Sequence, residues 1–265
     1  MIAEGNILKM RAEYDTPVQY FLPVGDAELC MNDLIGKEIR FIFGGQVNCI
    51  SCGKVTRTSY GQGFCYNCLQ TAPEAAESVL QPQLSKAHFG IARDMEYAEK
   101  YDLIEHVVYL VLSPGLKVGV TRHHQVPVRW IDQGAAAAMP LAKTPNRHIA
   151  GVMEGWLKQF YSDKTNWRDM LTNKQAPETD PAGEKRKALE LLPAELKKHA
   201  YEPDEITRIN YPVLRYPENV TPLSLDKTPQ ISGKLTGIRG QYLIFDGGYV
   251  LGIRKHNGYL LTVEW

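Results

Sequence analysis

The chain has 265 residues, of which 44% are hydrophobic and 23% are charged, and its 30 basic side chains balance 30 acidic ones. This length supports one large core or several small domains. Zero net charge excludes a uniformly basic surface for nucleic acid, so such a surface must be a local patch. The N-terminus lacks a signal-peptide pattern and no apolar run reaches membrane length. We therefore expect a soluble cytoplasmic protein.

The N-terminal part of the chain is predicted to be β-rich. Residues 1–29 contain two runs that mix apolar and polar positions on either side of a turn at 15–17. A stronger strand is predicted over 35–45, where Ile39 and Phe41 alternate with charged residues. This strand leads directly into a cysteine-rich segment.

Four of the five cysteines form two matched Cys-x-x-Cys pairs with twelve residues between the pairs. Each pair can direct two sulfur atoms at one ion, and four thiolates favour a closed, structural zinc site. A redox dithiol is the alternative, but two matched pairs are far more specific than one. We predict a zinc ribbon or treble-clef knuckle with the ligands Cys49, Cys52, Cys65 and Cys68.

The segment around these cysteines also carries Lys54 and Arg57 beside two tyrosines. Basic and aromatic side chains together suit contact with a phosphate backbone and with bases. Lys54 and Arg57 are therefore candidate nucleic-acid contacts. The alternative is a purely structural metal staple for a core that is too small to stand alone.

Residues 73–105 are predicted to form a helical connector. Pro73 suits the first turn of one helix, and the run 92–103 interleaves acidic and basic residues in a helical composition. The connector would join the zinc module to the central part of the chain.

The central stretch from His106 to Lys158 has the predicted element order β-β-α-β-α. Ser113, Pro114 and Gly115 separate two β-rich runs, which predicts a tight hairpin. Asn146 is a suitable N-cap for the last helix. The elements are predicted over 107–112, 116–121, 126–133, 135–142 and about 147–161.

This order, with the residues that it carries, resembles the GIY-YIG nuclease domain. Val107-Val108-Tyr109 stands for the Gly-Ile-Tyr motif of that family, and the run from Lys117 through Gly119 to Thr121 stands for the Tyr-Ile-Gly motif. Arg129 lies where the family has its helix arginine, and Glu154 lies where it has its metal-binding glutamate. The resemblance covers about a fifth of the chain.

The resemblance implies a divalent-metal-dependent endonuclease. Tyr109 would be the general base, Arg129 the phosphate clamp and Glu154 the ligand of Mg²⁺ or Mn²⁺. The reaction requires groups of these three kinds, because phosphodiester cleavage needs a base, positive charge beside the phosphate and a divalent ion at the leaving oxygen. A single carboxylate suits Mg²⁺, which keeps most of its waters.

The second motif departs from the family pattern because Lys117 replaces its tyrosine. A lysine can hold a phosphate as a point charge but cannot act as a phenol. His123 could take over the acid–base work, and Arg122 and His124 complete a local basic cluster that favours a phosphate-bearing ligand. The alternative is a domain of this shape that has lost cleavage and keeps only its nucleic-acid surface.

The C-terminal third is predicted to be a short helical region followed by a β-domain. A polar linker over 174–184 precedes a helix over 185–200 that Pro193 interrupts. The Asn257-Gly258 dipeptide is a strong hairpin signal, and short strands at close spacing predict a small barrel or sandwich. The β-rich N-terminus could complete this sheet and bring the chain ends together.

These predictions combine into an α+β protein of five parts. The predicted function is that of a nucleic-acid-binding zinc protein, with endonuclease activity on structured DNA or RNA as one interpretation. A non-catalytic RNA- or ribosome-associated protein and a protein-interaction module are the alternatives. The layout also resembles an uncharacterised bacterial family. The parts are the β-rich region with its zinc knuckle (1–72), the connector (73–105), the GIY-YIG-like domain (106–173), a linker and helix (174–205) and the C-terminal β-domain (206–265).

Overall fold

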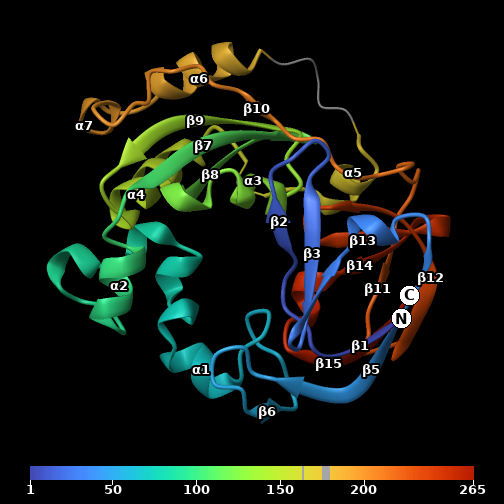
Figure 1. Cartoon of the computed structure of the whole chain (residues 1–265). Coiled ribbons are helices and arrows are strands. Elements are labelled where there is room, and N and C mark those ends of the chain that lie inside the picture. The colour runs from blue at the N-terminus through green and yellow to red at the C-terminus, as the bar shows by residue number, and fades with distance from the viewer. Residues whose placement is uncertain (163, 175–179) are drawn as a thin grey trace.

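The computed structural model describes residues 1–162, 164–174 and 180–265. Its elements form a ring around a central opening (Figure 1). In this view the green sheet of the central stretch lies at the top, the connector at the left and the cysteine-rich module at the bottom. The strands from both chain ends close the ring at the right. The fold is mixed and β-rich, as predicted.

The largest sheet joins the two ends of the chain. It has eight strands in the order β1-β15-β5-β12-β13-β14-β11, with β6 paired to β5. Ile39 and Phe41 on β5 are buried while Glu38 and Arg40 are exposed, as the alternating sequence predicted. Each such buried side chain contributes about 2 kcal/mol of hydrophobic stabilisation. The strands are β1 (Ile2–Asn6), β5 (Glu38–Asn48), β6 (Val55–Thr56), β11 (Thr221–Leu223), β12 (Gln230–Arg239), β13 (Tyr242–Phe245), β14 (Tyr249–Gly252) and β15 (Tyr259–Glu264).

A small antiparallel sheet packs against the same core. Its three strands lie in the order β2-β3-β4, and Tyr20 and Leu22 on the middle strand have no exposed surface. Its strands are β2 (Arg11–Glu13), β3 (Gln19–Val24) and β4 (Ala27–Cys30), and the turn η1 (Asn32–Leu34) follows them.

The central stretch has the predicted order β-β-α-β-α and forms an antiparallel sheet β10-β9-β7-β8. Alternate residues of the middle strand β7 pack into two different cores: Tyr109 into the large core, and Val108 and Leu110 against α4. The helix α4 buries Ala150, Met153 and Leu157 at helical spacing. It ends at Leu157, earlier than predicted. The elements are β7 (His106–Ser113), β8 (Gly115–Arg122), η6 (His123–Gln125), α3 (Val128–Asp132), β9 (Ala137–Thr144), α4 (Arg147–Leu157) and β10 (Thr207–Arg208).

The predicted helices of the connector are wrong except for one. Only α2 (Met95–Tyr101) is an α-helix, and the rest is a series of short 3₁₀ turns. Proline at the start of two turns removes backbone donors, and close packing on α4 fixes the path. A Cβ atom at Gly151 would lie 2.1 Å from the backbone nitrogen of Gln83. The turns are η2 (Pro73–Ala75), η3 (Glu77–Val79), η4 (Pro82–Leu84) and η5 (Ala87–Phe89).

Three short helices lie among the described residues of the segment after the central stretch. In α5 (Trp167–Leu171), the Trp167 ring stacks on Tyr242. The predicted linker lies partly outside the described residues, and its end already belongs to α6 (Pro181–Glu190). As predicted, Pro193 separates α6 from α7 (Ala194–Lys197). Among the described residues, no helix has the length and apolar character that crossing a bilayer requires.

Candidate functional site

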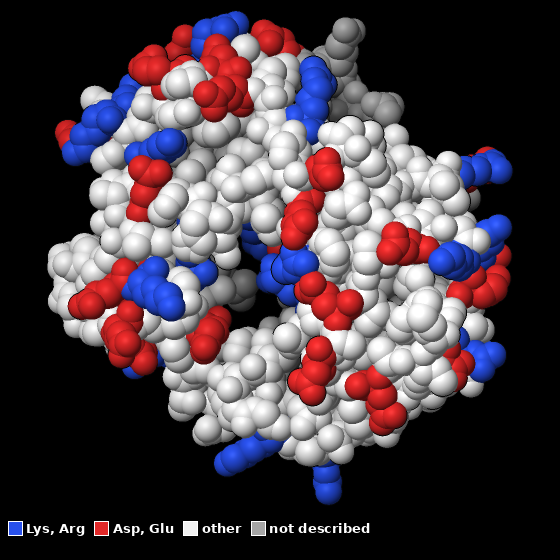
Figure 2. All heavy atoms as spheres, viewed as in Figure 1, with Lys and Arg blue, Asp and Glu red and all other residues white. Residues whose placement is uncertain are grey.

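A cavity of about 570 Å³ lies at the centre of the ring. Its walls come from the N-terminal loop, the connector, the central sheet with its helices, and the C-terminal segment. Seven lining side chains are Lys or Arg and three are Asp or Glu, a formal excess of four positive charges. Figure 2 shows the hollow, with Lys and Arg side chains at its rim. A neutral chain therefore concentrates positive charge in one concave site, which attracts anions.

The cavity runs along β8, the edge strand of the central sheet. Tyr109 on β7 lies directly opposite Gly119 on β8. The Tyr109 hydroxyl accepts a hydrogen bond of 2.9 Å from the Nε2 atom of Gln133, and its ring packs against Trp130. A Cβ atom at Gly119 would lie 2.7 Å from this hydroxyl, so only glycine leaves room for the phenol.

The protonation state of Tyr109 follows from its surroundings. Burial raises the pKa of Tyr109 above its ordinary value, whereas Arg129 and the hydrogen bond from Gln133 act in the opposite direction. Nearby Glu154 raises this pKa further. Tyr109 is therefore a neutral phenol at pH 7, and both predicted partners lie close enough to influence it.

Glu154 reaches the cavity from α4, on the other face of the sheet from Tyr109. Glu154 is 8% exposed, and its carboxylate lies 3.4 Å from the Nζ atom of Lys158, one turn further along the helix. Lys117 on β8 is 6% exposed and lines the same cavity. The structure thus brings Tyr109, Lys117, Arg129 and Glu154 to one site along the edge of β8.

Several other predicted residues lie elsewhere. Arg122 lines the cavity, but His123 and His124 are exposed on η6 and do not line it. His123 instead lies with its Nδ1 atom 3.3 Å from the backbone oxygen of Glu105. Lys54 and Arg57 are exposed on the cysteine-rich module and are also absent from the lining.

Two cavity residues from the chain ends were not predicted to lie in this site. Lys9 lies in the loop after β1, and its Nζ atom contacts Asp132 on α3 at 2.8 Å. Arg254 lies in η8 (Ile253–His256), close to Arg129 and Asp132. The strands of the chain ends and the central stretch form separate sheets, and their packing around one hydrophobic core carries these side chains to the cavity.

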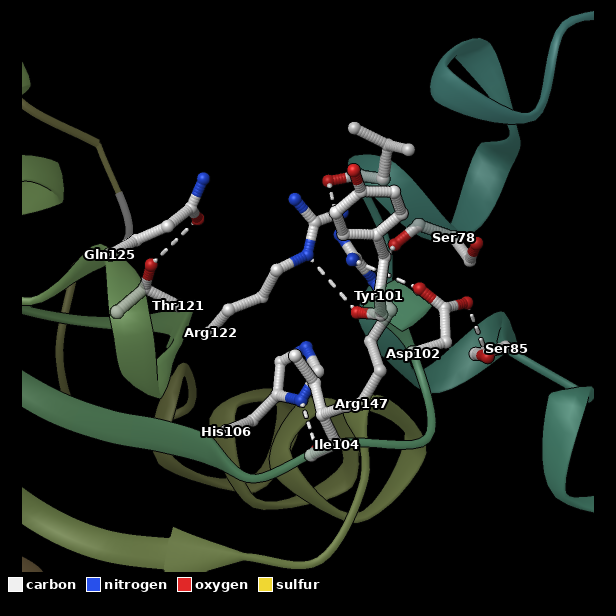
Figure 3. A network of polar contacts seen from close by, with 11 residues as sticks. Ser78, Ser85, Tyr101, Asp102, Ile104, His106, Thr121, Arg122, Gln125 and Arg147 are labelled. Carbon is white, nitrogen blue, oxygen red and sulfur yellow. Dashed lines mark hydrogen bonds and ion pairs between the residues drawn. The ribbon is translucent and has the colours of Figure 1, made fainter. Parts of the chain in front are cut away.

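A polar network supports the end of the cavity near the connector (Figure 3). Arg147 donates to the backbone oxygen of Ser78 at 2.8 Å and lies 3.2 Å from Asp102. Asp102 also accepts a hydrogen bond from Ser85, and Arg122 donates to the backbone oxygen of Tyr101. These bonds hold the two arginines in fixed positions at the cavity wall.

His106 lies beneath this network and is expected to make the protein acid-sensitive. Burial lowers its pKa to about 4, with the Arg147 and Arg122 charges acting in the same direction. As the pH falls from about 6.5 to about 4, the His106 imidazole takes up a proton in the unfolded chain but stays neutral in the folded chain. The free energy of unfolding should therefore fall by about 2–3 kcal/mol over this range through His106 alone.

Urea unfolding at pH 7 and pH 4.5 tests this expectation. The His106→Gln variant should lose less stability between the two pH values than the parent chain, because it has no imidazole to protonate. Exposed His123→Gln is the control and should behave like the parent. An equal loss in parent and His106→Gln would show that other groups cause the acid sensitivity.

The cysteine pairs meet as the sequence predicted. The four sulfur atoms of Cys49, Cys52, Cys65 and Cys68 lie within 4.8 Å of one another. The first pair follows β5, and Cys65 is the N-cap of α1 (Tyr66–Thr71). The Cys52 and Cys65 sulfurs are 3.9 Å apart. Tetrahedral zinc with Zn–S bonds of about 2.3 Å requires sulfurs about 3.8 Å apart, so the geometry fits.

The protonation of these thiols also favours a metal ion. Burial and the neighbouring thiols raise the pKa of Cys68 to about 12. Burial acts to raise the pKa of Cys49 as well, but hydrogen bonds from the backbone of Cys52 and Cys65 outweigh it and lower the pKa to about 6. Four adjacent thiols can all ionise only beside a cation. The four cysteines are therefore positioned to bind a metal ion, plausibly zinc.

Comparison with known proteins identifies the family of this chain. No curated protein and no solved structure shows a significant match to the chain. A family model described as "Protein of unknown function (DUF2797)" matches residues 36–261, which include the four cysteines and all of the cavity except Lys9. The chain belongs to the DUF2797 family.

Proposed function

We propose that the protein binds nucleic acid in its central cavity and cleaves phosphodiester bonds there with the help of a divalent metal ion. One observation carries this proposal. Tyr109, Lys117, Arg129 and Glu154 line the same cavity, which has an excess of positive charge although the whole chain is neutral.

The charged residues of the cavity divide into two roles. Arg129 and Lys117 would bind the phosphate, the arginine through a bidentate fork and the lysine as a point charge. Glu154 is the carboxylate that would hold Mg²⁺ or Mn²⁺, and a single carboxylate fits an ion that keeps most of its waters. Such an ion would stabilise negative charge on the leaving oxygen.

Tyr109 would act as the general base. Its hydroxyl is within reach of Gln133 and Arg129, which orient it and favour its ionised form. The close approach of Gly119 to this hydroxyl gives a physical reason for a glycine in the second strand. This pair, the observed element order and Arg129 on α3 support the resemblance to the GIY-YIG domain.

The second candidate is a non-catalytic nucleic-acid-binding protein. Two observations favour it: Tyr109 has no exposed surface, and Glu154 approaches from the opposite face of the sheet. Lys54, Arg57 and His124 would then contact the strand outside the cavity, because all three are exposed. In this case the Glu154→Gln variant would bind nucleic acid as the parent chain does, and neither protein would cleave it.

Cleavage of labelled oligonucleotides with and without Mg²⁺ tests the proposal. Glu154→Gln removes the negative charge with little change in shape, so we expect cleavage to fall at least about 100-fold while binding is retained. Glu99→Gln, an exposed change on α2 away from the cavity, is the matched control. Parent chain that binds oligonucleotides but shows no metal-dependent cleavage would establish the second candidate instead.

A further inference from the structure

Contacts between parts of the chain that are distant in sequence hold the ring around the central cavity together. Asn257 donates a hydrogen bond of 3.0 Å to the backbone oxygen of Gln62, which joins the cysteine-rich module to the C-terminal segment. On the other side, His148 on α4 lies 2.9 Å from the backbone oxygen of Gln83 in the connector. These contacts close the ring seen in Figure 1.

The size of the cavity restricts what can enter it. A volume of about 570 Å³ corresponds to a cube with edges of about 8 Å, whereas the major groove of a B-form duplex is by itself about 12 Å wide. Tyr109, with no exposed surface, lies in the wall of this cavity. A duplex is therefore too wide to enter the cavity, whereas the cavity has room for an unpaired nucleotide.

Arg254 lines this cavity and is suited to bind an anion. It is half-buried and has no hydrogen bond or ion pair with any of the described residues. Asp132, a carboxylate that lines the same cavity, already accepts a hydrogen bond from Lys9 and another from Gln241. Arg129 lines the same cavity; burial lowers the pKa of Arg254 and the Arg129 charge lowers it further, whereas Asp132 acts in the opposite direction.

An anion between the two arginines would offset their like charges. A phosphate offers several acceptor oxygens to guanidinium forks and carries the charge that the site lacks. Arg129 comes from the central stretch and Arg254 from the C-terminal segment, so a phosphate would also link the two walls of the cavity.

Building on the proposed function, we infer that the cavity accepts an unpaired strand of nucleic acid and that Arg254 and Arg129 together bind one of its phosphates. The small size of the cavity, rather than contacts with particular bases, then makes the protein prefer single strands over duplexes. Arg254 acts in binding and holds the strand beside the reacting centre.

Fluorescence anisotropy with the full chain tests this inference. The probe is one labelled oligonucleotide, used single-stranded or annealed to its complement, in DNA and RNA forms. We expect the single strand to bind at least about tenfold more tightly than the duplex. Arg254→Ala should weaken single-strand binding about tenfold and reduce the slope of log affinity against log salt by about 0.7. The exposed neighbour Lys255→Ala should stay within about twofold of the parent.

The outcomes separate this inference from the proposed function. Arg254→Lys controls for folding and should retain part of the affinity, because it keeps the charge but loses the fork. Equal or tighter binding of the duplex, or unchanged affinity in Arg254→Ala, would overturn the inference. Glu154-dependent cleavage of a duplex would do the same while leaving the proposed function in place. Absence of binding to every probe would overturn both.

Discussion

Replacing Cys68 with serine is expected to release the bound metal and unfold the cysteine-rich module. The module has a very small core, with Phe64 and Ala72 as its buried residues besides two of the cysteines. Such a core cannot stabilise itself, whereas zinc binding to four thiolates supplies about 10–16 kcal/mol in comparable small domains. The metal content measured by plasma mass spectrometry should fall from about one ion per chain to near zero. The melting temperature should fall by about 10 °C or more.

Cys30→Ser is the matched control for this experiment. Cys30 lies on β4 outside the cluster and is only partly buried, so its replacement should leave the metal content unchanged. Loss of the module should also open the ring, because Gln62 and Ile50 connect it to the C-terminal turn at Asn257 and Gly258. A Cys68→Ser protein that keeps its metal and its melting temperature would contradict the four-sulfur site.

The parts of the structure that the sequence predicted well depend on local patterns. The metal ligands lie within one short segment, and their spacing alone determines that four sulfurs can meet. The alternation of β5 and the spacing of apolar residues on α4 likewise report directly on which face is buried. The hairpin of β7 and β8 follows from its turn residues.

The connector shows where local preference fails. Its alanine- and glutamate-rich sequence favours helix, but the observed 3₁₀ turns follow Pro73 and Pro82. The turn at Pro82 lies almost in contact with the backbone of α4, and only the missing side chain of Gly151 permits this approach. Tertiary packing therefore determines the path of this segment, and single-sequence propensity cannot report it.

The cavity could be predicted only in part for a related reason. His123 is near Lys117 in sequence, but the direction of its side chain depends on the turn η6, which exposes it. Arg254 is more than a hundred residues from Arg129, and the packing of two separate sheets around one core brings both to the same cavity. Neither the exposed direction of a side chain nor a contact of this range has a local sequence signal.

Replacing Tyr109 with phenylalanine is expected to reduce metal-dependent cleavage by about 10²–10⁴-fold, the usual contribution of a general base. The pH dependence gives a second, independent readout. Because burial raises the pKa of Tyr109, only a small fraction of the phenol is ionised at neutral pH. Cleavage by the parent chain should therefore rise about tenfold per pH unit between pH 6 and pH 9, and this slope should disappear in Tyr109→Phe.

The Tyr109→Phe change should leave the fold and the binding of substrate largely intact. It removes one oxygen and leaves the Nε2 atom of Gln133 without its partner, at a cost of about 1–3 kcal/mol in unfolding free energy. Tyr20→Phe is the matched control, because Tyr20 is equally buried but does not line the cavity. A slope that survives in Tyr109→Phe would assign the ionisation to another group. If Tyr109→Phe also cleaved near the parent rate while Glu154→Gln abolished cleavage, Tyr109 would be a packing residue at the edge of β8. The general base would then be another residue of the cavity.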